Sequence, residues 1–496
     1  MVFNSIEFLV FFPIVVFIYY LIPLKYRYIW LLISSYYFYY TCSPEYVILL
    51  LGTTLITYGS GRLLGIIDKK DIANSKTLIA RKVVLTVCVI VNLMPLFFYK
   101  YLDFFLININ RVVNVENSSL WGLNLLLPIG ISFYTFQALG YVIDVYRGEM
   151  EAEKNLLKYG LFVSFFPLLL SGPIERAKNM LTQIENTARF NVMNIKSGLL
   201  SVAWGLFLKI VVADRIAIHI NPMFKEPLEF DGMVLLVAAV LFAFQIYCDF
   251  EGYSQMAIGI AQILGYRVKA NFAMPYLATS VQDFWRRWHI SLTSWFRDYV
   301  YISLGGNRKG KIRKYINNMI VFLISGLWHG VGWKYIAWGG LNGAFIVMEN
   351  ITKNMRAKMC SKFGIITDNF VFRTLNRIST FLVIDLCWIF FNAHSLGVGI
   401  SILQKIVCDF RVKYIFTEEF WSSFGTIENF AIMVISLFIV FIVDIAKEHG
   451  IDVKTKIFKQ QIIARWALYI VMIWVILFWG VYGEGYAQTQ FIYFQF

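Results

Sequence analysis

Charged residues are scarce in this chain. Asp, Glu, Lys and Arg make up 15% of its 496 residues, against about a quarter in a typical soluble domain. Hydrophobic residues reach 58%, and aromatic residues alone reach 18%. This balance excludes an ordinary soluble globular protein. It predicts an integral membrane protein that has the lipid bilayer as its surroundings.

Cysteine and acidic residues are also few. The six cysteines show neither paired nor metal-ligand spacing, so we expect no disulfide framework and no metal site. Only 31 acidic residues face 45 basic ones, which gives a net charge of +14. The basic residues fall in short loops between apolar stretches, where Lys and Arg set the orientation of membrane helices. This pattern does not favour nucleic-acid binding. The cysteines are Cys42, Cys88, Cys248, Cys360, Cys387 and Cys408.

Apolar stretches of membrane-spanning length recur along the chain. Clear candidates lie near 6–22, 45–61, 83–99, 194–212, 233–249, 374–393, 427–445 and 466–482. Stretches interrupted by Gly, Pro or polar residues lie near 29–41, 128–145, 158–171, 316–329 and 333–348, and some are expected to be re-entrant. We therefore predict an all-α, multi-pass membrane protein with about ten to twelve crossings. No half-length repeat is visible, which disfavours a secondary transporter.

The distribution of Lys and Arg predicts the orientation. Basic residues concentrate at 62–82, 307–314 and 447–465, and none follows Arg465. Since short cytoplasmic loops carry the excess of positive charge, these segments are placed in the cytoplasm. Counting helices from them places the N-terminus outside the cell. The last helix then runs outward, so the tail at 483–496 is expected outside as well.

The segment "VQDFWRRWHISLTSWFRDYVYISLGGNRKG", residues 281–310, combines tryptophan with arginine. Apolar residues recur in it at spacings of 3, 4, 3 and 4, which predicts one apolar stripe of a helix. The opposite face is polar, so we expect a helix at the cytoplasmic interface, with His289 between its two faces. A tryptophan-anchored interfacial helix without a chemical role is the alternative. The stripe is Trp285, Trp288, Leu292, Trp295 and Tyr299.

His329 stands in the apolar run "SGLWHGVGWKYIAWGGLNGAF". Ionisable groups within a membrane are candidates for function, although a lone histidine is often a satisfied core residue. Six surrounding glycines include two small-xxx-small spacings, which would let helices approach closely or leave room for a substrate beside the imidazole. The glycines are Gly326, Gly330, Gly332, Gly339, Gly340 and Gly343.

These two segments, together with "FQIYCDFEGYSQMAIGIAQILGY", resemble the membrane-bound O-acyltransferase (MBOAT) family. The resemblance covers nearly the whole chain and is nearest to the bacterial alginate and peptidoglycan O-acetyltransferases. It implies one MBOAT membrane domain over 1–496, with helices around a central tunnel that cytosolic acyl donor enters from one side. His329 matches the essential histidine of the family, and His289 matches the second motif histidine.

The expected chemistry suits these residues. Acyl transfer from a thioester needs a group that takes a proton from the attacking hydroxyl and returns one to the leaving thiolate, and imidazole suits both tasks at neutral pH. A covalent acyl-histidine intermediate is an open alternative. The resemblance makes acetyl-CoA the expected donor. Its phosphates would be bound by Arg286, Arg287, Arg297 and Arg308, although positive-inside topology alone would also place arginines there.

The chain ends in "FIYFQF", an aromatic tail with a single hydroxyl, on Tyr493. The donor stays in the cytoplasm while a cell-surface polymer lies outside, so we expect Tyr493 to carry the acyl group between them. The pKa of a phenol, about 10, is closer to that of a thiol than the pKa of a sugar hydroxyl is. A tyrosyl ester therefore keeps much of the acyl-transfer potential of the thioester. A belt of aromatic residues at the outer interface is the alternative.

The resemblance thus predicts O-acetylation of a cell-surface polysaccharide, either peptidoglycan or an exopolysaccharide, at the bacterial plasma membrane. It also implies an extracytoplasmic SGNH-type acetyltransferase as partner. Two alternatives stay open: D-alanyl transfer to teichoic acid within the same family, and a non-catalytic polysaccharide exporter or channel with histidines in its pore.

Overall fold

A computed structural model describes residues 1–68, 74–113, 127–186, 189–482 and 491–492, with only the backbone described at 110–113. Every regular element in these residues is helical. Helices satisfy all their internal main-chain hydrogen bonds within one segment, which is what an apolar chain in lipid requires. The predicted all-α fold is therefore confirmed.

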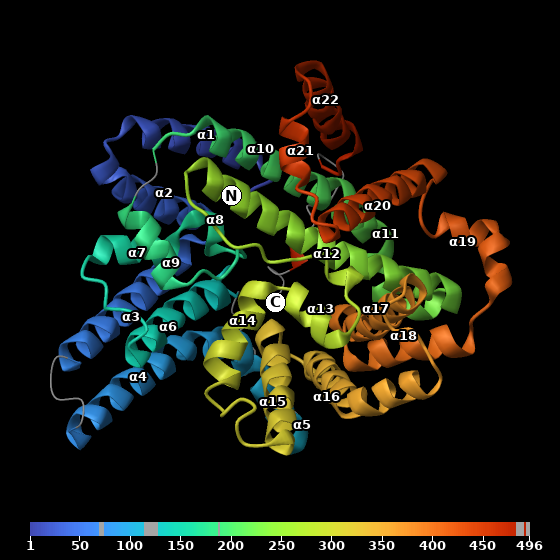
Figure 1. Ribbon diagram of the computed structural model, residues 1–496, viewed down its shortest axis with the longest axis horizontal. Helices are drawn as coiled ribbons and strands as arrows, with labels where there is room; N and C mark the ends of the chain where they lie inside the picture. Colours follow the sequence, from blue (N-terminus) through green and yellow to red (C-terminus); the bar gives the residue numbers. More distant parts are fainter. Residues whose placement is uncertain (69–73, 114–126, 187–188, 483–490, 493–496) are drawn as a thin grey trace. The chain divides into compact units, whose positions relative to one another are not determined.

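The contacts of the chain divide it into two compact units, and Figure 1 labels the helices that form them. Among the described residues, unit 1 comprises Met1–Val202 and Met256–Lys269, and unit 2 comprises the residues from Ala203 to Gln255 and from Ala270 onward. The chain passes to unit 2 within α10 (Val192–Leu206), returns to unit 1 within α12 (Gly232–Ile263) and passes to unit 2 again between Lys269 and Ala270. That the whole of 1–496 acts as a single membrane domain stays a prediction.

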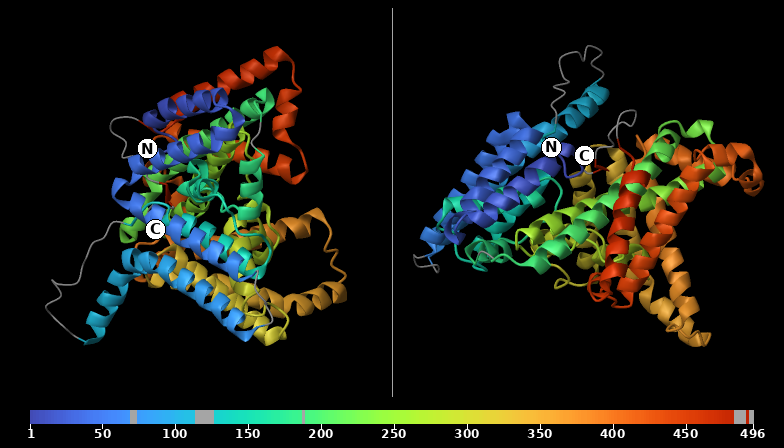
Figure 2. Two further views of the ribbon diagram at one scale, coloured as in Figure 1. Left: turned by 90° about the vertical axis from the view of Figure 1, so that its left-hand side faces the viewer. Right: turned by 90° about the horizontal axis from the view of Figure 1, so that it is seen from above.

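Unit 1 is built around a helix that is buried on all sides. Every residue of α6 from Ile131 to Val142 is buried, and α3 and α4 both pack against this helix. The blue helices of residues 1–96 gather into one bundle in Figure 2. The elements are α1 (Ile6–Leu21), α2 (Arg27–Cys42), α3 (Val47–Ile67), α4 (Ser75–Leu96), a π-helical turn (Phe97–Tyr101), α5 (Leu102–Val113), α6 (Ile131–Arg147), α7 (Leu156–Ser164), α8 (Phe166–Leu169), α9 (Ala177–Glu185) and α10 (Val192–Leu206).

Unit 2 has a core of tryptophan rings. Trp288, Trp338 and Trp388 are each 1% exposed, and the Trp388 ring lies 5.0 Å from that of Trp288 and 5.9 Å from that of Trp338. The elements are a π-helical turn (Phe207–Ala213), α11 (Asp214–Lys225), α12 (Gly232–Ile263), α13 (Val281–Arg287), α14 (Ile290–Phe296), a second π-helical turn (Arg297–Tyr301), α15 (Lys311–His329), α16 (Trp333–Lys362), α17 (Phe370–Asn392), α18 (Leu396–Cys408), α19 (Glu418–Ser422), α20 (Ile427–Glu448), α21 (Val453–Phe458) and α22 (Ile462–Trp479).

Seven helices in the described residues are long and apolar enough to cross a membrane. They are Pro44–Ile67, Ser75–Ile109, Val192–Lys225, Gly232–Ile263, Phe370–Asn392, Ile427–Glu448 and Ile462–Trp479, and shorter apolar helices lie at Ile6–Leu21 and Leu396–Cys408. Eight of the nine overlap apolar stretches predicted from the sequence, and Leu396–Cys408 was not among the predicted stretches. The multi-pass membrane protein is confirmed, and the total of ten to twelve crossings stays a prediction.

All six cysteines lie in the described residues and are free. Cys88, Cys248 and Cys387 are buried, as expected of small apolar side chains, whereas Cys408 is exposed at the end of α18.

Candidate active site

The tryptophan-rich segment is not the single helix that its spacing predicts. The structure has two short helices, α13 and α14, separated by Trp288 in an extended conformation and His289 in the left-handed region, with φ +43° and ψ +55°. The main-chain N–H of Ile290 donates to the main-chain oxygen of Asn271 at 2.8 Å. The Ile290 N–H is therefore bonded to a distant segment and not to a carbonyl of the preceding helical turn, so the helix is interrupted. Because the partner is distant in the sequence, periodicity alone did not reveal the break.

The tryptophan stripe faces protein and not lipid. Trp285 and Trp288 are at most 8% exposed, and Trp285 packs against Phe322 and Trp338 with ring centroids 5.3 and 5.6 Å away. These rings therefore do not anchor the segment in lipid, and its place at the cytoplasmic interface stays a prediction. Burial of the rings fixes the positions of the polar residues between them.

His289 is held by an asparagine that the sequence analysis did not single out. The Oδ1 atom of Asn271 lies 3.3 Å from His289 Nδ1 and accepts a hydrogen bond from Ser291 Oγ at 2.7 Å, while Nδ2 donates to Ser254 Oγ at 3.2 Å. Because an amide oxygen only accepts, it places the imidazole proton on Nδ1 and the lone pair on Nε2. Asn271 thus determines which nitrogen of His289 is basic.

The surroundings of His289 keep it neutral. The side chain is 1% exposed, and its ring meets that of Phe250 edge to face at 4.6 Å. Burial lowers the pKa of His289 to about 3, because the charged form loses its hydration. A neutral imidazole suits orientation or hydrogen bonding more than proton uptake near pH 7.

His329 is the last residue of α15 and is 3% exposed. Three aromatic rings surround it, those of Trp328 at 4.8 Å, Trp338 at 4.9 Å and Phe391 at 5.4 Å. The Trp328 ring also lies 6.2 Å from that of His289. The two predicted histidines therefore lie in one aromatic environment, although forty residues separate them in the chain.

Glycines allow the turn after His329 to be tight. A Cβ atom on Gly326 would lie 2.3 Å from the main-chain oxygen of Tyr335, and one on Gly330 would lie 2.1 Å from the Tyr335 ring. A Cβ on Gly339 would lie 2.4 Å from the main-chain oxygen of Phe322. The close approach of helices predicted from the glycine spacing is confirmed for α15 and α16, which lie side by side in Figure 1.

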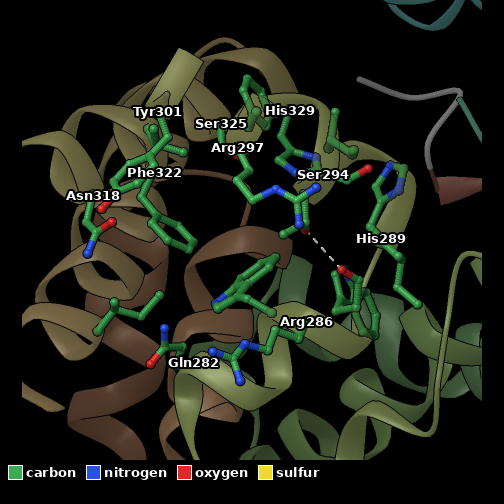
Figure 3. A pocket seen from close by; sticks show the side chains of 18 of the residues that line it. Gln282, Arg286, His289, Ser294, Arg297, Tyr301, Asn318, Phe322, Ser325 and His329 are labelled. Atoms are coloured by element: carbon green, nitrogen blue, oxygen red, sulfur yellow. Dashed lines mark hydrogen bonds between the residues drawn. The ribbon is translucent and has the colours of Figure 1, made fainter. Parts of the chain in front are cut away.

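Both histidines line a cavity of about 570 Å³ in unit 2 (Figure 3). In this view the two imidazoles and Ser294 lie on one side of the cavity, and Gln282, Arg286 and Asn318 lie on the other. One face of α15 supplies Lys314, Asn318, Val321, Phe322, Ser325 and His329, at helical intervals of three or four residues apart from one adjacent pair. The cavity thus combines two imidazoles and aromatic rings with three basic side chains, of which Arg297 lies beside His329 in this view.

The four predicted arginines separate in the structure. Arg286 and Arg297 line the cavity, and Arg297 also pairs with Asp298 at 2.7 Å. Arg287 instead pairs with Asp283 at 3.0 Å and with Glu448 at 2.7 Å, and Arg308 is exposed outside the set of lining residues.

Lys314 adds a positive charge to the cavity that the prediction left out. It donates to Asn350 at 2.6 Å and lines the cavity from α15. The sequence held a signal for it, because Lys314 belongs to the basic run 307–314 and lies fifteen residues before His329, on the same helical face.

The predicted carrier, Tyr493, lies outside the described residues. Its two preceding neighbours, Phe491 and Ile492, are described, and both are buried in unit 2. Their contacts are treated below.

Comparison with known proteins connects this arrangement to acyl transfer. The model of the membrane-bound O-acyltransferase family matches residues 152–390, which include both histidines. The chain is 37% identical over 403 residues to the probable alginate O-acetylase AlgI of Pseudomonas syringae pv. tomato, covering 80% of this chain and 74% of that protein.

Two further relatives have different acceptors in their names. A peptidoglycan O-acetyltransferase of Helicobacter pylori is 33% identical over 405 residues, covering 76% of this chain and 73% of that protein. A teichoic acid D-alanyltransferase of Streptococcus thermophilus is 30% identical over 264 residues, covering 50% of this chain and 63% of that protein.

Proposed function

Because the chain belongs to the membrane-bound O-acyltransferase family, we propose that it moves an acetyl group from cytosolic acetyl-CoA through the membrane for O-acetylation of a cell-surface polysaccharide. The observation that carries this proposal is the joint lining of one cavity by His329, His289 and basic residues. Similarity to both an alginate and a peptidoglycan O-acetylase supports a polysaccharide as the final acceptor.

His329 is the proposed acid-base residue. It takes the proton from the attacking hydroxyl as the oxygen bonds to the acetyl carbon, and it returns a proton to the thiolate as the carbon–sulfur bond breaks. The aromatic rings around it exclude water, which protects the thioester from hydrolysis. His289, neutral and oriented by Asn271, is placed to hold a hydrogen bond beside it.

The basic side chains that line the cavity suit acetyl-CoA as the donor. Arg286, Arg297 and Lys314 would bind phosphate groups of acetyl-CoA, because guanidinium and ammonium groups form strong charge-assisted hydrogen bonds with them. Arg287 and Arg308, also named in the sequence analysis, lie outside this lining. The donor therefore enters from the side of the basic residues, which the distribution of Lys and Arg assigns to the cytoplasm.

Tyr493 is the proposed first acceptor. Its phenol oxygen attacks the thioester, releasing coenzyme A as the thiol and forming an acetyl-tyrosyl ester. Complete removal of the phenol proton by a histidine with a pKa near 6.5 would cost about 5 kcal/mol for the 3.5-unit gap, so proton transfer is concerted with attack. The ester then passes its acetyl group to an extracytoplasmic SGNH-type partner and to the sugar hydroxyl, a poorer leaving group.

The test is direct detection of the carrier in purified protein. After incubation with acetyl-CoA, we expect mass spectrometry of the C-terminal peptide to show one acetyl group on Tyr493 in the wild type and none in Tyr493→Phe or His329→Gln. In cells, Tyr493→Phe is expected to lose polymer acetylation at unchanged protein abundance. Wild-type acetylation in Tyr493→Phe would contradict the carrier and leave the aromatic belt as the role of the tail.

The alternative acyl group can be distinguished in the same assay. The relative from Streptococcus thermophilus is named a teichoic acid D-alanyltransferase, and it covers half of this chain. Labelling of Tyr493 from a D-alanyl thioester carrier protein, and not from acetyl-CoA, would favour D-alanyl transfer. We expect acetyl-CoA to label it, because the acetyltransferase relatives cover three quarters or more of the chain.

A further inference from the structure

The end of the described chain is buried in unit 2. Phe491 is 3% exposed and Ile492 is 8% exposed, whereas the alternative of an aromatic belt would place them at the outer interface. Both residues contact polar side chains of the helical stretches 207–225 and 232–263. A buried, specific contact of this kind is unlike a belt of aromatic residues in the headgroup region.

The contact centres on three buried charges. Lys209 Nζ lies 2.6 Å from Asp249 Oδ1 and 2.8 Å from Asp214 Oδ1, and the three side chains are at most 8% exposed. Both helical stretches are apolar enough to span a membrane, where charged side chains are rare and usually functional. The ammonium group of Lys209 is shared between one oxygen of each carboxylate, so the second oxygen of Asp249 requires a donor of its own.

The tail supplies such a donor. The main-chain N–H of Ile492 donates to Asp249 Oδ2 at 2.8 Å, while the other oxygen of the same carboxylate accepts from Lys209. The Phe491 ring lies over Lys209, with 4.3 Å from Nζ to the ring centroid, and meets the Tyr253 ring edge to face at 4.9 Å. The tail thus satisfies the carboxylate and gives the ammonium group an aromatic face.

The segment that leads to the tail is fixed to the same stretch of helix. The N–H of Val481 donates to the main-chain oxygen of Ile210 at 2.9 Å, and Arg215 donates to the main-chain oxygen of Trp479 at 2.6 Å. Residues 479–481 and 491–492 are therefore both held by residues 209–215. That stretch begins in a π-helical turn, an irregularity that is frequent at functional sites.

We propose that Lys209 and Asp249, together with Tyr253, form the docking site of the C-terminal segment and are positioning residues for Tyr493, which directly follows Ile492. The docking rests on the contacts above, and the positioning rests in addition on the proposed function of Tyr493. The docking site binds main chain and one aromatic ring, so it recognises the tail next to the hydroxyl and leaves the hydroxyl to react.

A matched pair at residue 492 tests the docking. Ile492→Pro removes the N–H that Asp249 accepts, and Ile492→Ala removes most of the side chain but keeps the N–H. In the purified full-length protein, we expect slow hydrogen exchange of the C-terminal amides to persist in Ile492→Ala and to be lost in Ile492→Pro. Equal protection of the two variants would overturn the docking site.

A second pair at residue 491 tests the contact with Lys209 without changing the main chain. Phe491→Tyr keeps an aromatic face over the ammonium group, and Phe491→Leu replaces the ring by an aliphatic side chain. We expect Phe491→Tyr to retain the slow exchange of the C-terminal amides and Phe491→Leu to lose part of it. A tail held only by apolar burial would give the same protection in both variants, which would contradict a role for Lys209.

Polymer acetylation in the same variants tests the positioning. We expect polymer acetylation in cells with Ile492→Pro to be about tenfold or more lower than in cells with Ile492→Ala. This difference corresponds to the loss of one hydrogen bond to a charged group. Loss of protection in Ile492→Pro with acetylation equal to that of Ile492→Ala would overturn the positioning role. The Tyr493→Phe variant separates the carrier hypothesis from the docking hypothesis. Wild-type polymer acetylation in this variant would contradict the carrier role of Tyr493, whereas the protection of its C-terminal amides reports on docking alone.

Discussion

Two polar sites inside unit 2 are built on opposite principles. The cavity around His329 and His289 is lined by aromatic rings and two imidazoles, with its charges on exposed or half-buried side chains. The cluster of Lys209, Asp214 and Asp249 consists of full charges that pair with one another and with the tail, almost without exposure. This difference is what we expect if the first site binds a reacting molecule, as proposed above, and the second binds a fixed segment of the protein.

The difference has a physical reason. A buried charge is stable only with its partners in place, so a charged cluster resists rearrangement and suits docking. An imidazole at the wall of a cavity can exchange a proton with a bound molecule without a large change in packing, which is what acid-base turnover requires. Substitutions should therefore affect rate at the cavity and stability at the cluster.

The largest expected effect is on rate, at His329. His329→Gln keeps a neutral side chain of similar size but cannot shuttle the proton, so we expect acetyl transfer to fall by about 100- to 10,000-fold. The melting temperature should change little. Rates on purified protein with acetyl-CoA check this, with His394→Gln as a control at an exposed histidine outside the cavity. Activity within a few-fold of wild type in His329→Gln would contradict the acid-base role.

The next effect is on stability, at the buried cluster. Lys209→Met leaves two carboxylates buried without their ammonium partner, so we expect a loss of about 3–5 kcal/mol in the free energy of unfolding. Lys405→Met removes the same group from a pair with Asp409 that is partly exposed, and should cost less than about 1 kcal/mol. Thermal unfolding in detergent measures both. Equal losses in the two variants would remove the distinction between the cluster and an ordinary pair.

A smaller effect concerns pH, at His289. The pKa of His289 is lowered in the folded protein to about 3, against about 6.5 when unfolded, so the unfolded chain binds more protons between these values. The contribution of His289 to the free energy of unfolding is therefore fully present above pH 6.5 and decreases as the pH falls below it. At pH 5 the loss amounts to about 2 kcal/mol. His289→Gln should flatten the dependence of the melting temperature on pH between 7 and 5. A steeper dependence in the variant would contradict the assignment.

The smallest effect is on donor binding. Arg297→Gln and Arg286→Gln each remove one charge from the cavity wall, and we expect the KM for acetyl-CoA to rise about fivefold, equivalent to about 1 kcal/mol. Arg308→Gln, outside the lining, should leave KM near the wild-type value. An equal change in all three variants would indicate a general attraction of the donor to a basic surface and not a defined phosphate site.

Much of the site could be predicted from the sequence because histidine is rare in apolar segments. His329 and His289 were selected by residue type and local pattern. From the basic run 307–314, however, the prediction named Arg308, which lies outside the cavity lining, and missed Lys314, which is part of it. Asn271 was not found, because an asparagine in a polar loop carries no periodicity. Its role comes from hydrogen bonds to residues seventeen to twenty positions away in the chain.

The sequence by itself determined the membrane class, the position of the apolar helices and the two histidines. The length of an apolar segment and its charged residues are properties of the segment itself, so they are the same whatever the rest of the fold is. Only the tertiary structure decided where the helix breaks at His289, which arginines reach the cavity and that Lys209 and Asp249 meet the tail. The contacts with the tail join residues more than 240 positions apart, such as Asp249 with Ile492 and Lys209 with Phe491, and local patterns carry no information on such distances.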